Sequence, residues 1–185
     1  MARSETSKTA QTEEAWLPLK HILCPVDQAP VSTSEPPGAQ PDCAHGHGPT
    51  EAACRALKTA EELAVAFDGE LLLVHVVPPM PVPLPSIDGV PVPSFDVVAY
   101  EEQLRKHYHA SLERLRKERL SRDTKLRVRV VTGDPANEIV RLAKEEKSDL
   151  IVLPTHGRTG LSHVFFGSVA EKVVRHAECP VLTLH

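Results

Sequence analysis

One stretch near the carboxyl end combines glycines, a basic residue and a hydroxyl residue in a way that suits phosphate binding. Gly157 and Gly160 lie on either side of Arg158, and glycines let a loop turn with positive φ and let a ligand approach the backbone. Ser168 and Glu171 have the spacing of a capping box, which predicts that a helix begins at Ser168. A helix N-terminus favours anions, and an arginine adds charge-assisted contacts. The same residues are equally typical of a flexible turn before an ordinary helix.

The elements that would position this stretch alternate between short apolar runs and amphipathic segments. The apolar runs predict strands at 21–26, 70–77, 126–131, 149–153 and 180–184. Helical periodicity predicts helices at 51–67, at about 95–120, from 135 onward and at 168–177. Alternation of this kind indicates an α/β fold with a parallel sheet between helices. The nearly continuous apolar character of 70–77 is typical of a strand covered on both faces, whereas 126–131 alternates apolar and basic residues like an edge strand.

Residue types at the helix ends give sharper predictions. Asp134 suits an N-cap and Pro135 the first helical position of the helix that follows. In the first helix, helical spacing places Phe67 on the inward apolar face, and Asp68-Gly69 ends the helix.

A doubly wound sheet binds ligands outside the carboxyl ends of its strands, where the strand order reverses. In this chain that rule points to Asp27, to Val76 and Val77, and to the loop after Leu153. The glycine-containing stretch is part of that loop, so the phosphate-binding hypothesis and the fold converge on one place.

Composition excludes several classes of partner. The formal net charge is −4, and the most basic stretch, 105–129, has acidic residues mixed in, so no nucleic-acid surface is expected. The chain lacks the apolar core of a signal peptide at its start and any run of about 18 apolar residues. The four cysteines form no C-x-x-C pair. These observations predict a cytoplasmic protein with reduced thiols and no membrane span.

The length of 185 residues favours a single domain. Residues 1–16 are polar and predict a disordered tail. The domain would span 17–185, with an inserted loop at 28–50 and a proline-rich loop at 78–93.

Five segments, in order along the chain, resemble the universal stress protein (UspA) family. They are His21-Ile-Leu-Cys-Pro-Val-Asp27, Leu73-Val-His-Val-Val77, Gly133-Asp-Pro135, Thr155-His-Gly-Arg-Thr-Gly160 and Gly167-Ser-Val-Ala-Glu171. Nucleotide-binding members of the family carry the motif G-x2-G-x9-G-[ST]. Here the spacing is kept from Gly157 to Gly167 and Ser168, but Pro154 replaces the first glycine and removes a backbone N–H.

The resemblance implies a Rossmann-like fold of the adenine nucleotide alpha hydrolase type, with strand order 3-2-1-4-5. It implies ATP or another adenine nucleotide as the ligand, with or without Mg²⁺, and a homodimer formed through the last strand, Val181 to Leu184. Asp27 would accept a hydrogen bond from the adenine amino group. The expected binding residues are Pro25, Val26, Asp27 and Val76 around the adenosine, Leu153 near the base or ribose, and Gly157, Arg158, Gly160, Gly167, Ser168 and Val169 around the ribose and phosphates.

Three functions remain open. The first is a nucleotide-binding protein of stress response or signalling, with at most slow hydrolysis. The second is a true ATP hydrolase, in which Asp27, His156 and Mg²⁺ would act, although the sequence contains neither a P-loop nor a G-x-S-x-G elbow. The third is an interaction protein without nucleotide, which Pro154 and the insertion favour.

Two further signals have plainer interpretations. Cys43, His45, His47 and Cys54 are potential zinc ligands, but their spacing matches no common zinc motif, so no metal site is predicted. His75 lies within a buried strand and is interpreted as a core histidine with a satisfied hydrogen bond.

Overall fold

The computed structural model describes residues 18–28, 49–79, 96–155 and 167–185. Within these ranges the strands are β1 (His21–Pro25), β2 (Glu70–Val77), β3 (Lys125–Thr132), β4 (Leu150–Pro154) and β5 (Val181–Leu184). The helices are α1 (Glu51–Ala66), α2 (Val97–Arg119), α3 (Pro135–Glu145) and α4 (Ser168–His176). All strand pairs are parallel, in the order β3-β2-β1-β4-β5. This confirms the predicted doubly wound sheet.

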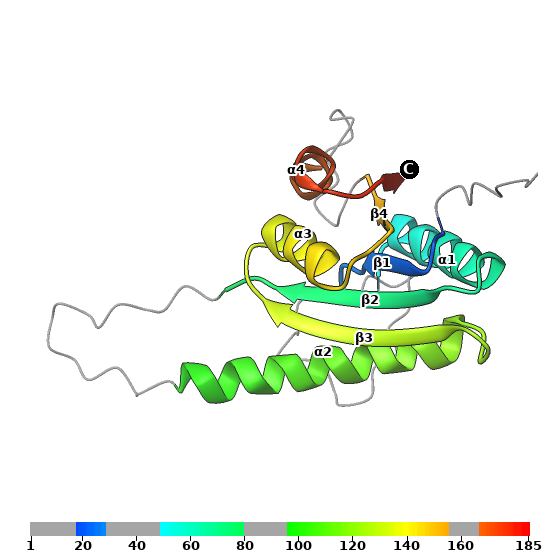
Figure 1. The fold of residues 1–185 in the computed structure, drawn as a ribbon. Coiled ribbons are helices and arrows are strands. Elements are labelled where there is room, and N and C mark those ends of the chain that lie inside the picture. The colour runs from blue at the N-terminus through cyan, green and yellow to red at the C-terminus, as the bar shows by residue number, and fades with distance from the viewer. Residues whose placement is uncertain (1–17, 29–48, 80–95, 156–166) are drawn as a thin grey trace, which may run out of the picture.

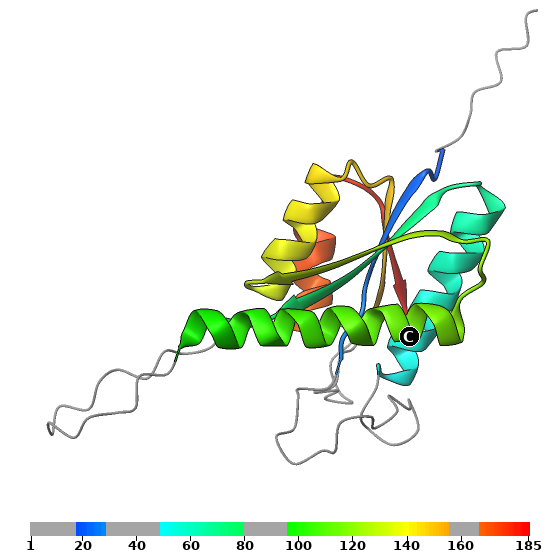
Figure 2. The same cartoon turned by 90° about the horizontal axis from the view of Figure 1, so that it is seen from below.

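Two helices cover each face of the sheet (Figures 1 and 2). Helices α1 and α2 pack on one face and α3 and α4 on the other. Side chains alternate along the central strands, so Leu71 and Leu73 join the first layer while Leu72 and Val74 join the second. The central strands are therefore mostly apolar along their length, because both of their faces are buried, and His75 of β2 is a buried polar exception.

The two predictions about strand environment are confirmed. Seven of the eight residues of β2 are buried, from Leu71 to Val77. Strand β3 lies at the edge of the sheet and alternates half-buried with exposed residues. The basic residues of β3 point to solvent, which explains the mixed pattern in the sequence.

The start of α3 and the end of α1 at Asp68-Gly69 are as predicted, whereas the orientation of the Phe67 side chain is not. Asp134 caps α3 by accepting a hydrogen bond from the N–H of Asn137 at 3.1 Å, and Pro135 is the first helical residue. Helix α1 ends at Ala66, and the chain turns at Phe67 with φ −101° and ψ 7°. The turn carries the Phe67 side chain off the apolar face, so it is 43% exposed instead of inward.

Helix α4 begins at Ser168 as predicted, but the capping box does not form. The N-cap is Gly167, one residue earlier than a box would need, and no side chain caps the helix. The Glu171 carboxylate pairs with Arg175 one turn further along instead. Ser168 is therefore the first helical residue and does not occupy the N-cap position.

Other predictions lie outside the described residues. These are the tail at 1–16 and most of the loops at 28–50 and 78–93. No helix in the described ranges is long and apolar enough to cross a membrane.

Candidate functional site

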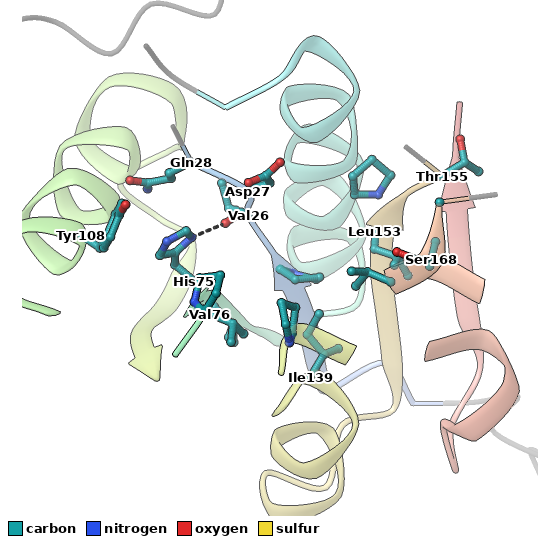
Figure 3. A pocket seen from close by; sticks show the side chains of 18 residues that line it. Val26, Asp27, Gln28, His75, Val76, Tyr108, Ile139, Leu153, Thr155 and Ser168 are labelled. Carbon is teal, nitrogen blue, oxygen red and sulfur yellow. Dashed lines mark hydrogen bonds between the residues drawn. The ribbon is translucent and has the colours of Figure 1, made fainter. Parts of the chain in front are cut away.

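A cavity of about 540 Å³ lies at the carboxyl ends of β1, β2 and β4 (Figure 3). It occupies the place where the strand order reverses between β1 and β4. The ladder between these two strands pairs Ile22 with Leu150 and Leu23 with Ile151. Strand β4 then continues along β5 as far as Pro154. Beyond the short β1–β4 ladder the cavity takes the place of further strand pairing.

Pro154 fits this position without the loss of a ladder hydrogen bond. The N–H groups of Ile151 and Thr155 donate to Pro180 and Leu184 on the β5 side. Because alternate residues of a strand point their N–H groups to opposite neighbours, the nitrogen of Pro154 faces the β1 side. Strand β1 no longer pairs with β4 at that level. The proline is therefore compatible with the strand and with the cavity that it lines.

The structure brings most of the predicted site residues together. Those that line the cavity are Pro25, Val26, Asp27, Val76, Leu153, Gly167, Ser168 and Val169. The predicted residues Gly157, Arg158 and Gly160, like His156, lie outside the described ranges, and their part in the site stays a prediction.

The potential zinc ligands give no cluster in the described part of the chain. Cys43, His45 and His47 lie outside it, and Cys54 lies on α1. Among the described residues, no group of three or more His, Cys, Asp or Glu side chains is arranged to hold a metal ion.

One end of the cavity is formed by the N-terminus of α4. Gly167 donates its N–H to the carbonyl of Thr155 at 2.7 Å, which fixes the start of the helix beside the end of β4. Ser168, Val169 and Ala170 follow, and all three line the cavity. The N–H groups of a first helical turn have no acceptor within their own helix. This end can therefore bind an anion through backbone donors and the helix dipole.

The opposite end holds three side chains that sequence reasoning did not group into a site: Gln28, His75 and Tyr108 (Figure 3). Nδ1 of His75 lies 2.9 Å from the carbonyl oxygen of Val26 and donates to it. This confirms the interpretation of His75 as a satisfied core histidine, and adds that it lines the cavity. The ring of Tyr108 packs on it, with a centroid separation of 4.2 Å and a tilt of 41°.

Burial shifts the pKa values of two groups, His75, which lines the cavity, and Cys24, which lies in the core layer shared with α1 and α2. Desolvation lowers the pKa of His75, although its bond to Val26 and the charge of Asp27 act in the opposite direction. The imidazole is therefore neutral at pH 7. Burial raises the pKa of the Cys24 thiol to about 12, so this cysteine is a core residue and not a nucleophile.

Asp27 lies between the two ends of the cavity and is half-buried (Figure 3). Apolar walls from β2, α3 and β4 surround it, among them Val76, Ile139 and Leu153. The cavity thus offers backbone donors at one end, a carboxylate in the middle, and an amide with two rings at the other end. This spatial order of groups along the cavity suits an elongated ligand with an anionic end and a planar polar end.

A doubly wound parallel sheet with a cavity at its strand-order switch defines the class of α/β domains that bind ligands at the carboxyl edge. Residues 46–185 match the model of the universal stress protein family. The chain belongs to this family.

Individual members of the family are similar to this chain in sequence and in structure. Universal stress protein MJ0531 of Methanocaldococcus jannaschii is 36% identical over 136 residues, which are 73% of this chain and 76% of the relative. The structure of UspA from Lactobacillus plantarum has a TM-score of 0.65 at 23% identity, and the match covers 90% of this chain and 98% of that one. A universal stress protein from Archaeoglobus fulgidus, solved in complex with dAMP, has a TM-score of 0.50 at 17% identity, with 90% and 98% coverage.

Proposed function

We propose that this protein binds an adenine nucleotide in the cavity and acts as a stress-response or signalling protein with at most slow hydrolysis. The observation that carries the proposal is the cavity of about 540 Å³ with the N-terminus of α4 at one end. Its volume is typical of pockets for small molecules and cofactors. The complex of the Archaeoglobus fulgidus relative with dAMP gives further support.

In this proposal the phosphates bind at α4. The backbone N–H groups of Ser168 and Val169 and the hydroxyl of Ser168 supply neutral donors, and the helix dipole adds favourable charge. Pro154 costs nothing in this arrangement, because none of these donors depends on it. Gly157, Arg158 and Gly160 would complete the phosphate site. ATP would bring Mg²⁺ as the counter-ion of its phosphates.

The nucleoside would extend from α4 over the ends of β4 and β1. Leu153 and Ile139 would contact the ribose and base, with Val76 beneath them, since all three line the cavity. The carboxylate of Asp27 would accept from the amino group of the adenine.

The experiment compares Gly167→Asp with Gly167→Asn. Gly167 has φ −69° and ψ 154°, which any residue can adopt, and both aspartate and asparagine are good N-caps. Only the aspartate places a negative charge against the phosphates, and like charges cost about 2–3 kcal/mol at such sites, or roughly 30–150-fold in affinity. We expect calorimetry with ATP to show this loss in Gly167→Asp and a clearly smaller loss in Gly167→Asn, whose side chain can occupy one of the same N–H donors but carries no charge.

Equal affinities in the two variants would reject the phosphate site at α4. Mass spectrometry of the acid-denatured wild-type protein would identify any nucleotide that is retained on purification. A protein that releases no nucleotide and shows no thermal shift with millimolar ATP would favour the interaction protein without nucleotide.

We further propose a cytoplasmic homodimer that forms through β5. Among the described strands, β5 pairs only with β4, and its four residues are half-buried in the isolated chain. An edge strand with an open side is a template for pairing with a second copy. Sedimentation should give the mass of a dimer at micromolar concentration, and a monomer under those conditions would reject this proposal.

A further inference from the structure

We propose that Gln28 selects the base of the nucleotide, by donating a hydrogen bond from its side-chain nitrogen to a ring nitrogen of adenine. This inference rests on the proposed function and extends it to a residue that neither the resemblance nor the glycine motif assigns. It concerns the end of the cavity that is formed by Gln28, His75 and Tyr108, opposite α4 (Figure 3).

The side chain of Gln28 is unusual in its burial. It is 7% exposed, and its Nε2 is buried with no hydrogen-bond partner. Buried donors in native proteins are nearly always paired, because an unmade hydrogen bond retains the full cost of desolvation. Gln28 also lines the cavity. A ligand that brings an acceptor to this end would therefore give the Nε2 of Gln28 the hydrogen bond that it lacks.

The position of Gln28 matches the place of a base. The phosphates and the base lie at opposite ends of a nucleotide, so phosphates at α4 send the base toward β1 and β2. Gln28 directly follows Asp27 in the chain, and it faces Tyr108 across this end of the cavity (Figure 3). The base would thus meet the carboxylate of Asp27 first and the amide of Gln28 beyond it.

The neighbours of Gln28 are suited to a planar ring. Tyr108 is 6% exposed and His75 is 5% exposed, and the two rings pack with their centroids 4.2 Å apart. The hydrogen bond from His75 to the carbonyl of Val26 fixes the orientation of the imidazole. Rigid aromatic side chains provide apolar contact for a base at little cost in conformational entropy.

The two polar groups together favour adenine over guanine. Adenine carries an amino donor beside ring nitrogens that accept, so Asp27 can accept while Gln28 donates. Guanine carries a carbonyl oxygen in place of that amino group, and this oxygen would be repelled by the carboxylate of Asp27. A ligand that leaves a buried polar group of the site unpaired loses far more affinity than a ligand that only loses apolar contact.

The first test measures the binding of ATP to Gln28→Leu. Leucine has a similar size and no donor, so we expect affinity to fall about tenfold, the value of one hydrogen bond in a buried site. The melting temperature of the nucleotide-free protein should stay the same or rise by about 2–4 °C, because the unpaired donor is gone. Gln103→Leu, at an exposed position on α2, is the matched control and should leave both quantities unchanged.

The second test uses ATP analogues that lack one ring nitrogen: 1-deaza-, 3-deaza- and 7-deaza-ATP. Against the wild-type protein one of them should bind about tenfold more weakly than ATP, and against Gln28→Leu the same analogue should show no penalty. Disappearance of the penalty is the signature of a direct hydrogen bond, because a purely structural role of Gln28 would leave the penalty in place.

The outcomes separate this inference from the function on which it rests. If the wild-type protein binds no ATP, both are overturned. If it binds ATP and Gln28→Leu binds equally well, or if the analogue penalties persist in Gln28→Leu, the role of Gln28 is overturned and nucleotide binding stands. A Gln28→Leu protein that melts well below the wild type would show that the glutamine stabilises the fold, and would also overturn the inference.

Discussion

The two ends of the sheet differ sharply in how their polar groups are used. At the amino ends of the strands, the carboxylate of Asp149 accepts from the backbone N–H groups of Lys20 and His21, each at 2.8 Å. The crevice there holds only about 10 Å³, room for no more than about one water molecule. At the carboxyl ends there is a cavity of about 540 Å³, and Gln28 has a buried donor without an acceptor.

The amino end is closed by contacts between segments that are distant in sequence. Lys20 donates from Nζ to the carbonyl of Phe67 at 2.8 Å, and Arg127 pairs with both Glu70 and Glu146 at 2.9 Å. The same strands thus carry stabilising contacts at their amino ends and a cavity that can bind a ligand at their carboxyl ends. Substitutions at the amino end should therefore change stability and leave the affinity for nucleotide unchanged, and the prediction for Asp149 tests that separation.

The largest effect is expected at Asp149. Replacement by alanine removes the acceptor of two backbone donors that tie β1 to the start of β4, and should lower the free energy of unfolding by about 3 kcal/mol. For a domain of this size, that lowers the melting temperature by roughly 6–12 °C. Chemical denaturation gives the free energy, and calorimetry with ATP should show affinity within about twofold of wild type.

Asp149→Asn is the control, since it keeps an acceptor oxygen and should lose about half as much stability, about 1.5 kcal/mol. An Asp149→Ala protein of normal stability but impaired ATP binding would contradict the separation of the two ends.

The next effect is expected at Gly69, also at the amino end. A Cβ atom there would lie 2.3 Å from the carbonyl oxygen of Leu19, which is backbone and cannot swing away. Gly69→Ala should therefore cost about 1–3 kcal/mol through local displacement. Urea denaturation measures this loss, and a variant as stable as wild type would mean that the two segments are less closely packed.

A smaller effect is expected from His75, at the carboxyl end, and it should depend on pH. Burial lowers the pKa of His75 below its ordinary value of 6.5. Near and below pH 6.5 the imidazole therefore binds a proton more readily in the unfolded chain than in the folded chain, so stability falls as the pH falls through this range. Unfolding free energies at pH 7.5 and pH 5.5 measure the loss.

His75→Asn serves as the reference for that comparison, because its amide nitrogen can replace Nδ1 as the donor to Val26 without titrating. The wild type should lose more stability than this variant between the two pH values. Equal losses would mean that His75 contributes nothing to the pH dependence.

The smallest effect is expected at Arg127. Its side chain is 44% exposed, and exposed ion pairs contribute about 0–1 kcal/mol each and are screened by salt. Arg127→Met should therefore lower stability by less than about 1 kcal/mol, and by less still in 1 M NaCl. A loss that is unchanged by salt would indicate that packing of the arginine stem, not its charge, is responsible.

The sequence was most informative where a pattern depends on local geometry. Alternation of apolar runs and helices, the Asp134-Pro135 helix start and the edge character of β3 follow from periodicity and capping, and all three are confirmed. The predicted helix start at Ser168 is also confirmed. The predicted capping box is wrong, because Gly167 is the N-cap and Ser168 lies in the first turn of the helix.

Features that depend on long-range packing could not be predicted. Tyr108 lies on the apolar stripe of α2 and has the pattern of an ordinary core residue. Its contact with His75 arises from the way α2 crosses β2, which no local pattern records. Gln28 stood at the start of a predicted loop, and its burial depends on the surroundings of the cavity.

Thr155 makes the segment 156–166 that follows it a natural splice point for engineering. Its carbonyl accepts from Gly167 at 2.7 Å, its N–H donates to Leu184 at 2.7 Å, and its hydroxyl lies 3.0 Å from Nδ1 of His185. The two ends of the segment 156–166 are therefore joined by one hydrogen bond and fastened to the end of β5. The entropy of closing a longer loop grows only with the logarithm of its length. A foreign segment grafted between Thr155 and Gly167 should therefore leave the sheet unchanged, while it would replace Gly157, Arg158 and Gly160 of the proposed phosphate site.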